Sequence, residues 1–173
     1  MFFPKSIIHL TIFLFSISGS LSLAEDYSDS DITKVVMLGS GNPFPDPERS
    51  GPSVAIIVNN VPYLFDAGAG VWQATGAATP KYGGTVKALE SNNISKVFIT
   101  HLHSDHVVGL PSLILLPWAL GREAPLEVWG PPGTENMVKH LTEAYREDVG
   151  SRKYGLGQDN DTGWRAVGHN VPK

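Results

Sequence analysis

The feature that most constrains this chain is a hexapeptide, His101-Leu-His-Ser-Asp-His106, directly after a short apolar run. That run, Lys96–Thr100 (Lys-Val-Phe-Ile-Thr), has β-branched and aromatic residues at its centre, which is typical of a buried strand. Three histidines and one aspartate therefore stand at the end of a core strand and not on a solvated tail. Neutral imidazole and carboxylate are ligand types that hold Zn²⁺ and similar ions.

The spacing of these four donors favours two metal positions over one. Where a strand opens into a tight loop, His101 and His103 can turn to one side, and Asp105 and His106 toward a second position. This fits a two-metal hydrolytic centre better than a structural zinc site. A chance cluster is the alternative, expected about one time in 1000 for a chain with so few histidines. The chain has no cysteine, which excludes Cys-ligated zinc, disulfides and a thiol nucleophile.

The rest of the sequence predicts a layered α/β fold. Strand patterns occupy residues 34–38, 54–58, 61–65, 96–100 and 126–129, and Asn59-Asn60 joins two of them as a hairpin. Glycines and prolines exclude regular structure over 39–52. Helical spacing occupies 85–91, 113–120 and 134–149, with Thr134 as N-cap and Gly150 as the stop. From Ser151 onward we find no helix or strand signal.

Three segments together resemble the metallo-β-lactamase-fold hydrolases, in particular their ribonuclease Z and arylsulfatase-like branch. Val97–Pro111, which carries His-x-His-x-Asp-His and then Gly-Leu-Pro, is the most specific of them. Leu38–Pro43 is similar to the first strand and glycine loop of that branch. Tyr63–Gly70 is similar to its strand-ending Asp-x-Gly turn. The resemblance covers roughly residues 34–130.

This resemblance implies an αββα sandwich with two divalent metal ions, expected to be Zn²⁺, at the edge of a sheet. His101 and His103 would hold the first metal, and Asp105 and His106 the second. A water activated by the two metals would attack an ester centre, and Asp105 would also handle its proton. The family pattern needs further ligands downstream, and His169 is the sole candidate for the first of them. It lies in a predicted loop, so its role as a ligand stays open.

Other candidates are weaker. Asp66 could orient a metal-binding histidine by a hydrogen bond or be a turn aspartate that bonds its own backbone; the resemblance favours the first. Gly39-x-Gly41 is not a dinucleotide motif, because prolines follow where a helix would start. We expect this loop to approach the site, with Ser40 or Asn42 lining it. His140 has no partner donors nearby and is predicted to be a surface histidine.

Residues 1–24 have the pattern of a secretory signal peptide: Lys5, an apolar stretch over 7–17, and small residues at Ser22-Leu-Ala24. The apolar stretch is shorter than the ~20 residues that a membrane span needs. We therefore predict cleavage after Ala24, a periplasmic or secreted location, and no membrane association afterwards.

Residues 25–173 are expected to form the N-terminal part of a metallo-β-lactamase-fold domain. The second αβ half of the sandwich, with the last ligands, has no counterpart before Lys173. One face of the first sheet would then lack its partner layer.

The leading functional interpretation is an exported metal-dependent hydrolase of phosphodiester, sulfate-ester or similar bonds in a small-molecule substrate. An alternative is ribonuclease Z-like processing of tRNA 3′ ends. The motif favours it, whereas the signal peptide and the net charge of -4 disfavour a nucleic-acid partner, since phosphate binding needs Lys and Arg. Three further possibilities stay open. The protein could open a lactone or β-lactam ring, it could be a non-catalytic metal-binding remnant, and it could form a homo-oligomer.

Overall fold

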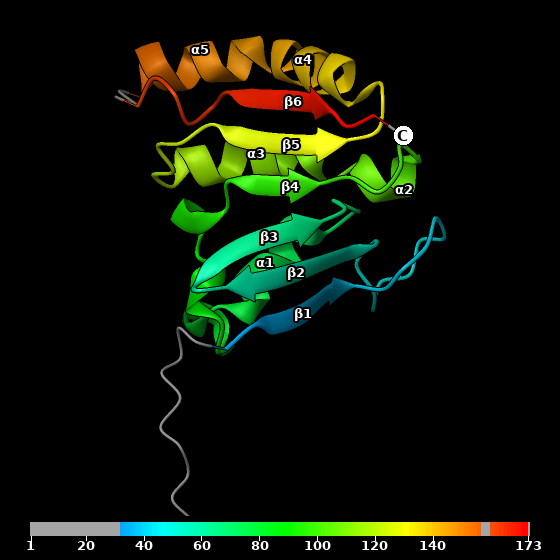
Figure 1. Ribbon diagram of the computed structural model, residues 1–173. Helices are drawn as coiled ribbons and strands as arrows, with labels where there is room; N and C mark the ends of the chain where they lie inside the picture. The colour runs from blue at the N-terminus through cyan, green and yellow to red at the C-terminus, as the bar shows by residue number, and fades with distance from the viewer. Residues whose placement is uncertain (1–31, 157–159, 173) are drawn as a thin grey trace, which may run out of the picture.

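The computed structural model describes residues 32–156 and 160–172, so the predicted signal peptide lies outside the described residues. The described chain forms one six-stranded mixed sheet whose strand order follows the sequence (Figure 1). The strands are β1 (Lys34–Gly39), β2 (Ser53–Val58), β3 (Val61–Phe65), β4 (Lys96–Phe98), β5 (Leu126–Gly130) and β6 (Ala166–Asn170). The predicted α/β class is confirmed, and five of these strands lie where the sequence pattern predicts them.

Strands β1 to β3 form an antiparallel meander at one side of the sheet. The predicted hairpin joins β2 to β3, with Val58 opposite Val61. Its two turn residues, Asn59 and Asn60, have φ values of 50° and 61°. Two successive positive φ values match the right-handed twist of a hairpin, and asparagine tolerates them better than most residues.

Strands β3 to β6 run parallel to one another, so their carboxyl ends meet at one edge of the sheet. Each parallel connection needs a crossover, and helices supply most of these. Figure 1 shows α1 and α3 behind the sheet, and α4 and α5 beside β6. The helices are α1 (Val71–Ala78), α2 (Ser104–Val107), α3 (Leu110–Ala119), α4 (Thr134–Ala144) and α5 (Arg146–Gly155). In the described part of the chain, no helix has the length and apolar character needed to cross a bilayer.

Two helix predictions are corrected by the structure. The helix predicted over 134–149 is two helices, because Tyr145 (φ -100°, ψ 16°) leaves helical geometry between α4 and α5. The N-cap is Gly133, not Thr134, and Gly150 lies inside α5 and does not end it. Residues 85–91 form no α-helix; the short 3-10 turns η2 (Lys87–Leu89) and η3 (Ser91–Asn93) replace it, after a third turn η1 (Pro80–Tyr82).

The sequence pattern also missed α1 and β6. Strand β6 reads Ala-Val-Gly-His-Asn, which has little strand character. Gly168 explains part of this, because a Cβ there would lie 2.6 Å from the Cα of Glu135 in α4. Close packing of α4 on β6 therefore demands a glycine at a position where a strand pattern would show a branched residue.

The two faces of the sheet are covered very differently. One face is buried beneath the helices, and its residues alternate along the strands; they include Leu38, Ala55, Ile57, Leu64, Val97 and Val128. The other face carries a row of aromatic rings, in which Phe98 stacks on Phe65 at 5.2 Å and on Trp129 at 4.9 Å. On the same face Met37 is 64% exposed. Figure 1 shows no helix or strand of the described residues in front of this row, here called the open face.

Arg122, which follows the end of α3, is a fully buried cation (0% exposed). Its guanidinium donates to four backbone carbonyls, those of Ile94 (3.1 Å), Leu113 (2.7 Å), Ile114 (2.6 Å) and Gly163 (2.6 Å). The Leu113 carbonyl needs this donor because Pro117, four residues later, has no N–H. Burial lowers the pKa of Arg122 from its ordinary value to about 10, which still leaves it charged at neutral pH. No carboxylate of the described residues pairs with it, so the carbonyls alone stabilise the charge.

Replacing Arg122 by methionine should lower the free energy of unfolding by about 3 kcal/mol or more, because four buried carbonyls lose their donor. Arg122→Lys should lose less, since the ammonium keeps three donors. Urea unfolding measures both. Arg146→Met is the matched control, because Arg146 is 72% exposed and its ion pairs with Glu143 and Glu147 lie on the surface. Equal unfolding midpoints for Arg122→Met and the unmodified chain would contradict this role.

Candidate metal centre

The histidine motif lies at the carboxyl edge of the parallel strands, packed against the turn that follows β3. The Ala67 amide donates to the His106 carbonyl at 2.7 Å, and the Gly109 amide donates to the Ala67 carbonyl at 2.8 Å. Gly68 has to be a glycine for this packing, because a Cβ there would lie 2.7 Å from the carbonyl oxygen of Asp105. The backbone thus fixes the motif loop against the end of β3.

Asp66 is the buried centre of this arrangement, with 7% of its surface exposed. Its backbone has φ 62°, a left-handed conformation that aspartate tolerates through local hydrogen bonding. Its carboxylate accepts from the Thr100 amide (2.8 Å) and the Thr100 hydroxyl (2.8 Å), and it contacts His106 Nδ1 at 2.8 Å. The predicted hydrogen bond between Asp66 and a motif histidine is therefore present, with His106 Nδ1 as the donor.

These contacts also assign the ring protons of two histidines. A carboxylate only accepts, so His106 Nδ1 carries the proton that it donates to Asp66. Thr100 has one hydroxyl proton, which it donates to Asp66, so the same oxygen accepts from His101 Nδ1 at 3.0 Å. In the neutral form of each ring, Nε2 is then the nitrogen without a proton and can bind a metal. Thr100 is a site residue that the sequence analysis missed; its position directly before His101 was the available signal.

The three motif histidines lie close together. The ring of His101 lies 4.5 Å from that of His103 and 4.1 Å from that of His106, measured between centroids. Asp105 Oδ2 lies 3.6 Å from His106 Nε2. His103 is exposed, whereas the other three are partly covered.

The donors fit a divalent cation in kind: two imidazoles in the binding tautomer, a third exposed imidazole and a carboxylate. Within residues 32–156 and 160–172, however, no group of three or more His, Asp or Glu side chains is already gathered as a metal site. The assignment of His101, His103, Asp105 and His106 as ligands, and of Asp105 as a catalytic group, therefore stays a prediction.

The glycine- and proline-rich loop does approach the motif, as expected. A hollow of about 350 Å³ lies between this loop and Asp105, and Asn42, Phe44 and Arg49 line it. Asn42 is the residue expected there; Ser40 does not line this hollow. A substrate group that enters it would lie beside the Asp105 carboxylate.

The two remaining histidines lie apart from the cluster. His140 is on the exposed side of α4, where its Nδ1 contacts the Asn136 carbonyl at 2.7 Å, so the surface prediction is confirmed. His169 lies in β6 and not in a loop. It stacks on Trp129 at 5.1 Å, and its Nε2 contacts Glu127 Oε2 at 2.6 Å. In this structure His169 therefore belongs to the open face, and its contacts are not with the motif.

Comparison with known proteins gives the same picture from the sequence side. The family model described as anti-Pycsar protein Apyc1 matches residues 33–126, more than half of the chain. Ribonuclease Z of Mycobacterium marinum is 36% identical over 122 residues, and that of Mycobacterium bovis is 35% identical over the same length. In both cases the match spans 69% of this chain and 40% of the relative.

Solved structures agree on the fold. Human tRNase Z, short form, superposes with a TM-score of 0.58 at 26% identity, covering 80% of this chain and 44% of that one. The metallo-beta-lactamase fold protein YhfI from Bacillus subtilis has a TM-score of 0.53 at 15% identity, and covers 82% of this chain and 46% of its own. The second similarity supports the fold alone.

Fold and motif together define a metallo-β-lactamase-fold protein of the ribonuclease Z-like type. Within that class, the chain belongs to the family described as anti-Pycsar protein Apyc1. It spans about 40% of the length of the curated relatives that it matches. The arylsulfatase-like side of the resemblance has no support among these relatives.

Asp66→Asn should weaken zinc binding by about 10–100-fold, the usual effect of losing a partner that orients a metal-binding histidine. Asparagine tolerates the positive φ, but its amide group replaces one acceptor oxygen. Equilibrium dialysis against Zn²⁺ measures the affinity, and circular dichroism checks the fold. Asp148→Asn on α5 is the control with the same change of charge. Unchanged zinc affinity in Asp66→Asn would contradict the role of Asp66.

Thr100→Val keeps the side-chain shape and the amide bond to Asp66, but removes the hydroxyl that holds His101. We expect the His101 ring to lose its fixed Nδ1–H tautomer, which histidine ring ¹⁵N NMR detects without any metal present. Thr142→Val, in which the lost hydroxyl bonds only the Val138 carbonyl of its own helix, is the control. A His101 tautomer that is the same in Thr100→Val as in the unmodified chain would refute the assignment.

Proposed function

We propose that this protein is a metal-dependent phosphodiesterase that cleaves RNA in the manner of ribonuclease Z. The observation that carries the proposal is the Asp66–Thr100 pair, which holds His101 and His106 by their Nδ1 atoms at the carboxyl edge of the sheet and leaves each Nε2 for a metal. Hydrogen-bond partners that fix the orientation of the ring are typical of metal-binding histidines, and a surface cluster without a metal does not need them.

In this proposal His101 and His103 hold one divalent cation, and Asp105 and His106 hold a second, with Zn²⁺ as the expected metal. The cations would supply Lewis-acid chemistry, which lowers the pKa of water and offsets negative charge that develops on phosphate oxygens. Asp66 and Thr100 keep the two rings in place. The Asp105 carboxylate, beside the loop hollow, receives a proton from the attacking water.

The loop hollow gives the substrate a place to lie. Arg49 lines it and supplies a guanidinium, whose planar donors suit a phosphate group. In the free protein Arg49 pairs with Asp46 at 3.1 Å, so a phosphate would have to compete for it. Phe44, 78% exposed in the same hollow, offers a ring on which a base can stack.

Two features of the sequence support a second candidate, an exported hydrolase of small phosphodiesters, sulfate esters or related esters. The first 24 residues have the pattern of a signal peptide, which predicts a periplasmic or secreted protein. The net charge of -4 offers little attraction to a long polyanion. The same donors and the same hollow would serve a small ester, so the two candidates differ in substrate and location.

The protein as its gene encodes it, loaded with Zn²⁺, should cleave an RNA that carries a tRNA-like 3′ trailer. His103→Ala should lower kcat/KM by at least about 100-fold and reduce bound zinc, measured by elemental analysis. His140→Ala, on the surface of α4, is the matched control and should change neither. Cleavage of bis(p-nitrophenyl) phosphate without cleavage of the RNA would favour the small-ester candidate. Normal zinc content and activity in His103→Ala would refute both.

A further inference from the structure

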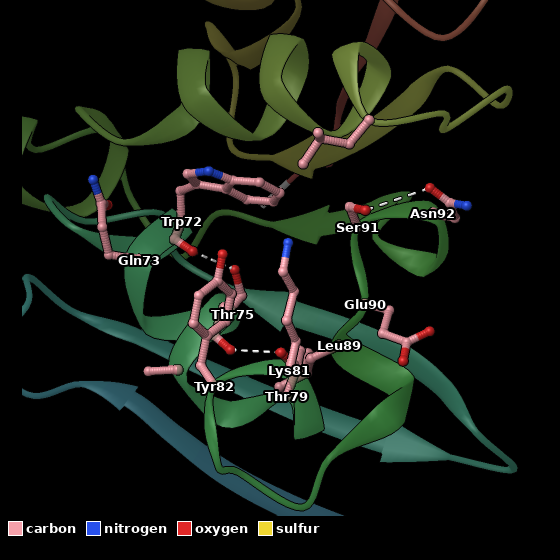
Figure 2. Close-up of a pocket in the computed structure, with 13 residues that line it drawn as sticks. Trp72, Gln73, Thr75, Thr79, Lys81, Tyr82, Leu89, Glu90, Ser91 and Asn92 are labelled. Carbon is pink, nitrogen blue, oxygen red and sulfur yellow. Dashed lines mark hydrogen bonds between the residues drawn. The ribbon is translucent and has the colours of Figure 1, made fainter.

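A second and larger hollow lies on the helix side of the sheet, between α1 and the η3 turn that precedes β4 (Figure 2). Its volume is about 670 Å³, within the ~300–1,000 Å³ range of small-molecule sites. Residues that matter for its chemistry are Trp72, Lys81, Tyr82, Ser91 and Asn92. It shares no residue with the histidine motif or with the loop hollow beside Asp105.

Aromatic and aliphatic groups form most of its walls. Trp72 packs against the hydrophobic core, which holds the indole in place. The ring of Tyr82 lies against α1 at Gly76, where an added Cβ would be 3.7 Å from the ring edge. Thr75 and Thr79 also line the hollow, but their hydroxyls donate to carbonyls of their own helix, at 2.7 Å and 2.6 Å. Both threonines are buried, and their hydroxyl protons are already donated within the chain and not offered to a ligand.

The polar groups that remain are few, and one of them is a cation. Lys81 Nζ lies 5.3 Å from the centre of the Tyr82 ring, and no carboxylate of the described residues forms an ion pair with it. Figure 2 shows its ammonium directed between Trp72 and Ser91, while the Glu90 carboxylate points away from it. Ser91 and Asn92 contact each other at 3.4 Å and add hydrogen-bonding groups beside the ammonium.

We propose that this hollow binds a small planar aromatic anion, with its ring between Trp72 and Tyr82 and its anionic group at Lys81. Two aromatic side chains favour a flat ring over an aliphatic group. The exposed Lys81 ammonium favours a negative charge on that ring, because an anionic group can form a charge-assisted hydrogen bond with it that a neutral group cannot. The proposal is independent of the hydrolase function.

The probe is 2-naphthoate, titrated into the chain by isothermal titration calorimetry. We expect saturable binding that Lys81→Gln weakens by about fivefold, the effect of one partly exposed ion pair. Lys87→Gln removes the same charge from the neighbouring η2 turn, outside the hollow, and should stay within about twofold of the unmodified chain. The neutral analogue 2-naphthamide should bind more weakly than 2-naphthoate, and Tyr82→Leu should weaken both.

Amide NMR locates the bound probe. Gly76 and Gly83, beside the hollow, should shift on titration, whereas Gly130 and Gly168, in β5 and β6, should not. No saturable binding, equal losses in Lys81→Gln and Lys87→Gln, or shifts confined to Gly130 and Gly168 would each overturn the proposal. So would a concentration-dependent dimer that Tyr82→Leu dissociates, because the occupant would then be a second copy of the chain.

Discussion

The carboxylate of Asp66 is the contact on which the metal-centre edge of this molecule depends. The backbone amide of Asp66 donates to the Phe98 carbonyl of β4 at 2.8 Å, and the Asp66 carbonyl accepts from the Ser53 hydroxyl of β2 at 2.9 Å. Its side chain holds Thr100 and His106. One residue in a left-handed conformation therefore joins three strand ends to the motif loop, and the orientation of the His101 and His106 rings follows from the position of this single carboxylate.

Several strands, the turn between β2 and β3 and the position of the histidine motif could be predicted from sequence, because their signals are local. Runs of β-branched and aromatic residues predicted β2 and β3, and Asn59-Asn60 predicted the turn between them. The hexapeptide was placed at the end of a strand, where it lies, and the family resemblance led to the prediction that Asp66 partners one of its histidines. Apart from the role of Asp66, these inferences need only neighbours in the chain, the residue types that favour strands, and the known preference of metals for imidazole and carboxylate.

Other features depend on contacts between distant residues and had no local signal. The sequence of β6 by itself predicts a loop, and the strand depends on the packing of α4 against Gly168. Nothing in the local sequence indicates that Arg122 is buried; its place depends on Pro117, whose missing N–H leaves the Leu113 carbonyl without a donor. The tautomer of His101 depends on the one proton of Thr100, which is already given to Asp66. In each case the local sequence allows several states, and a partner about 10 to 40 positions away selects one.

The buried guanidinium has a consequence for the order of events during synthesis. Arg122 leaves the ribosome 41 residues ahead of Gly163, one of its four acceptors, and 28 residues behind Ile94, another. Until Gly163 has left the ribosome, the Arg122 guanidinium lacks one of its four acceptor carbonyls and has to stay hydrated. The C-terminal end of α3 therefore cannot reach its final packing. Vectorial folding of this chain should therefore pause with the meander formed and β5 loosely docked, and lock only when the segment before β6 is released.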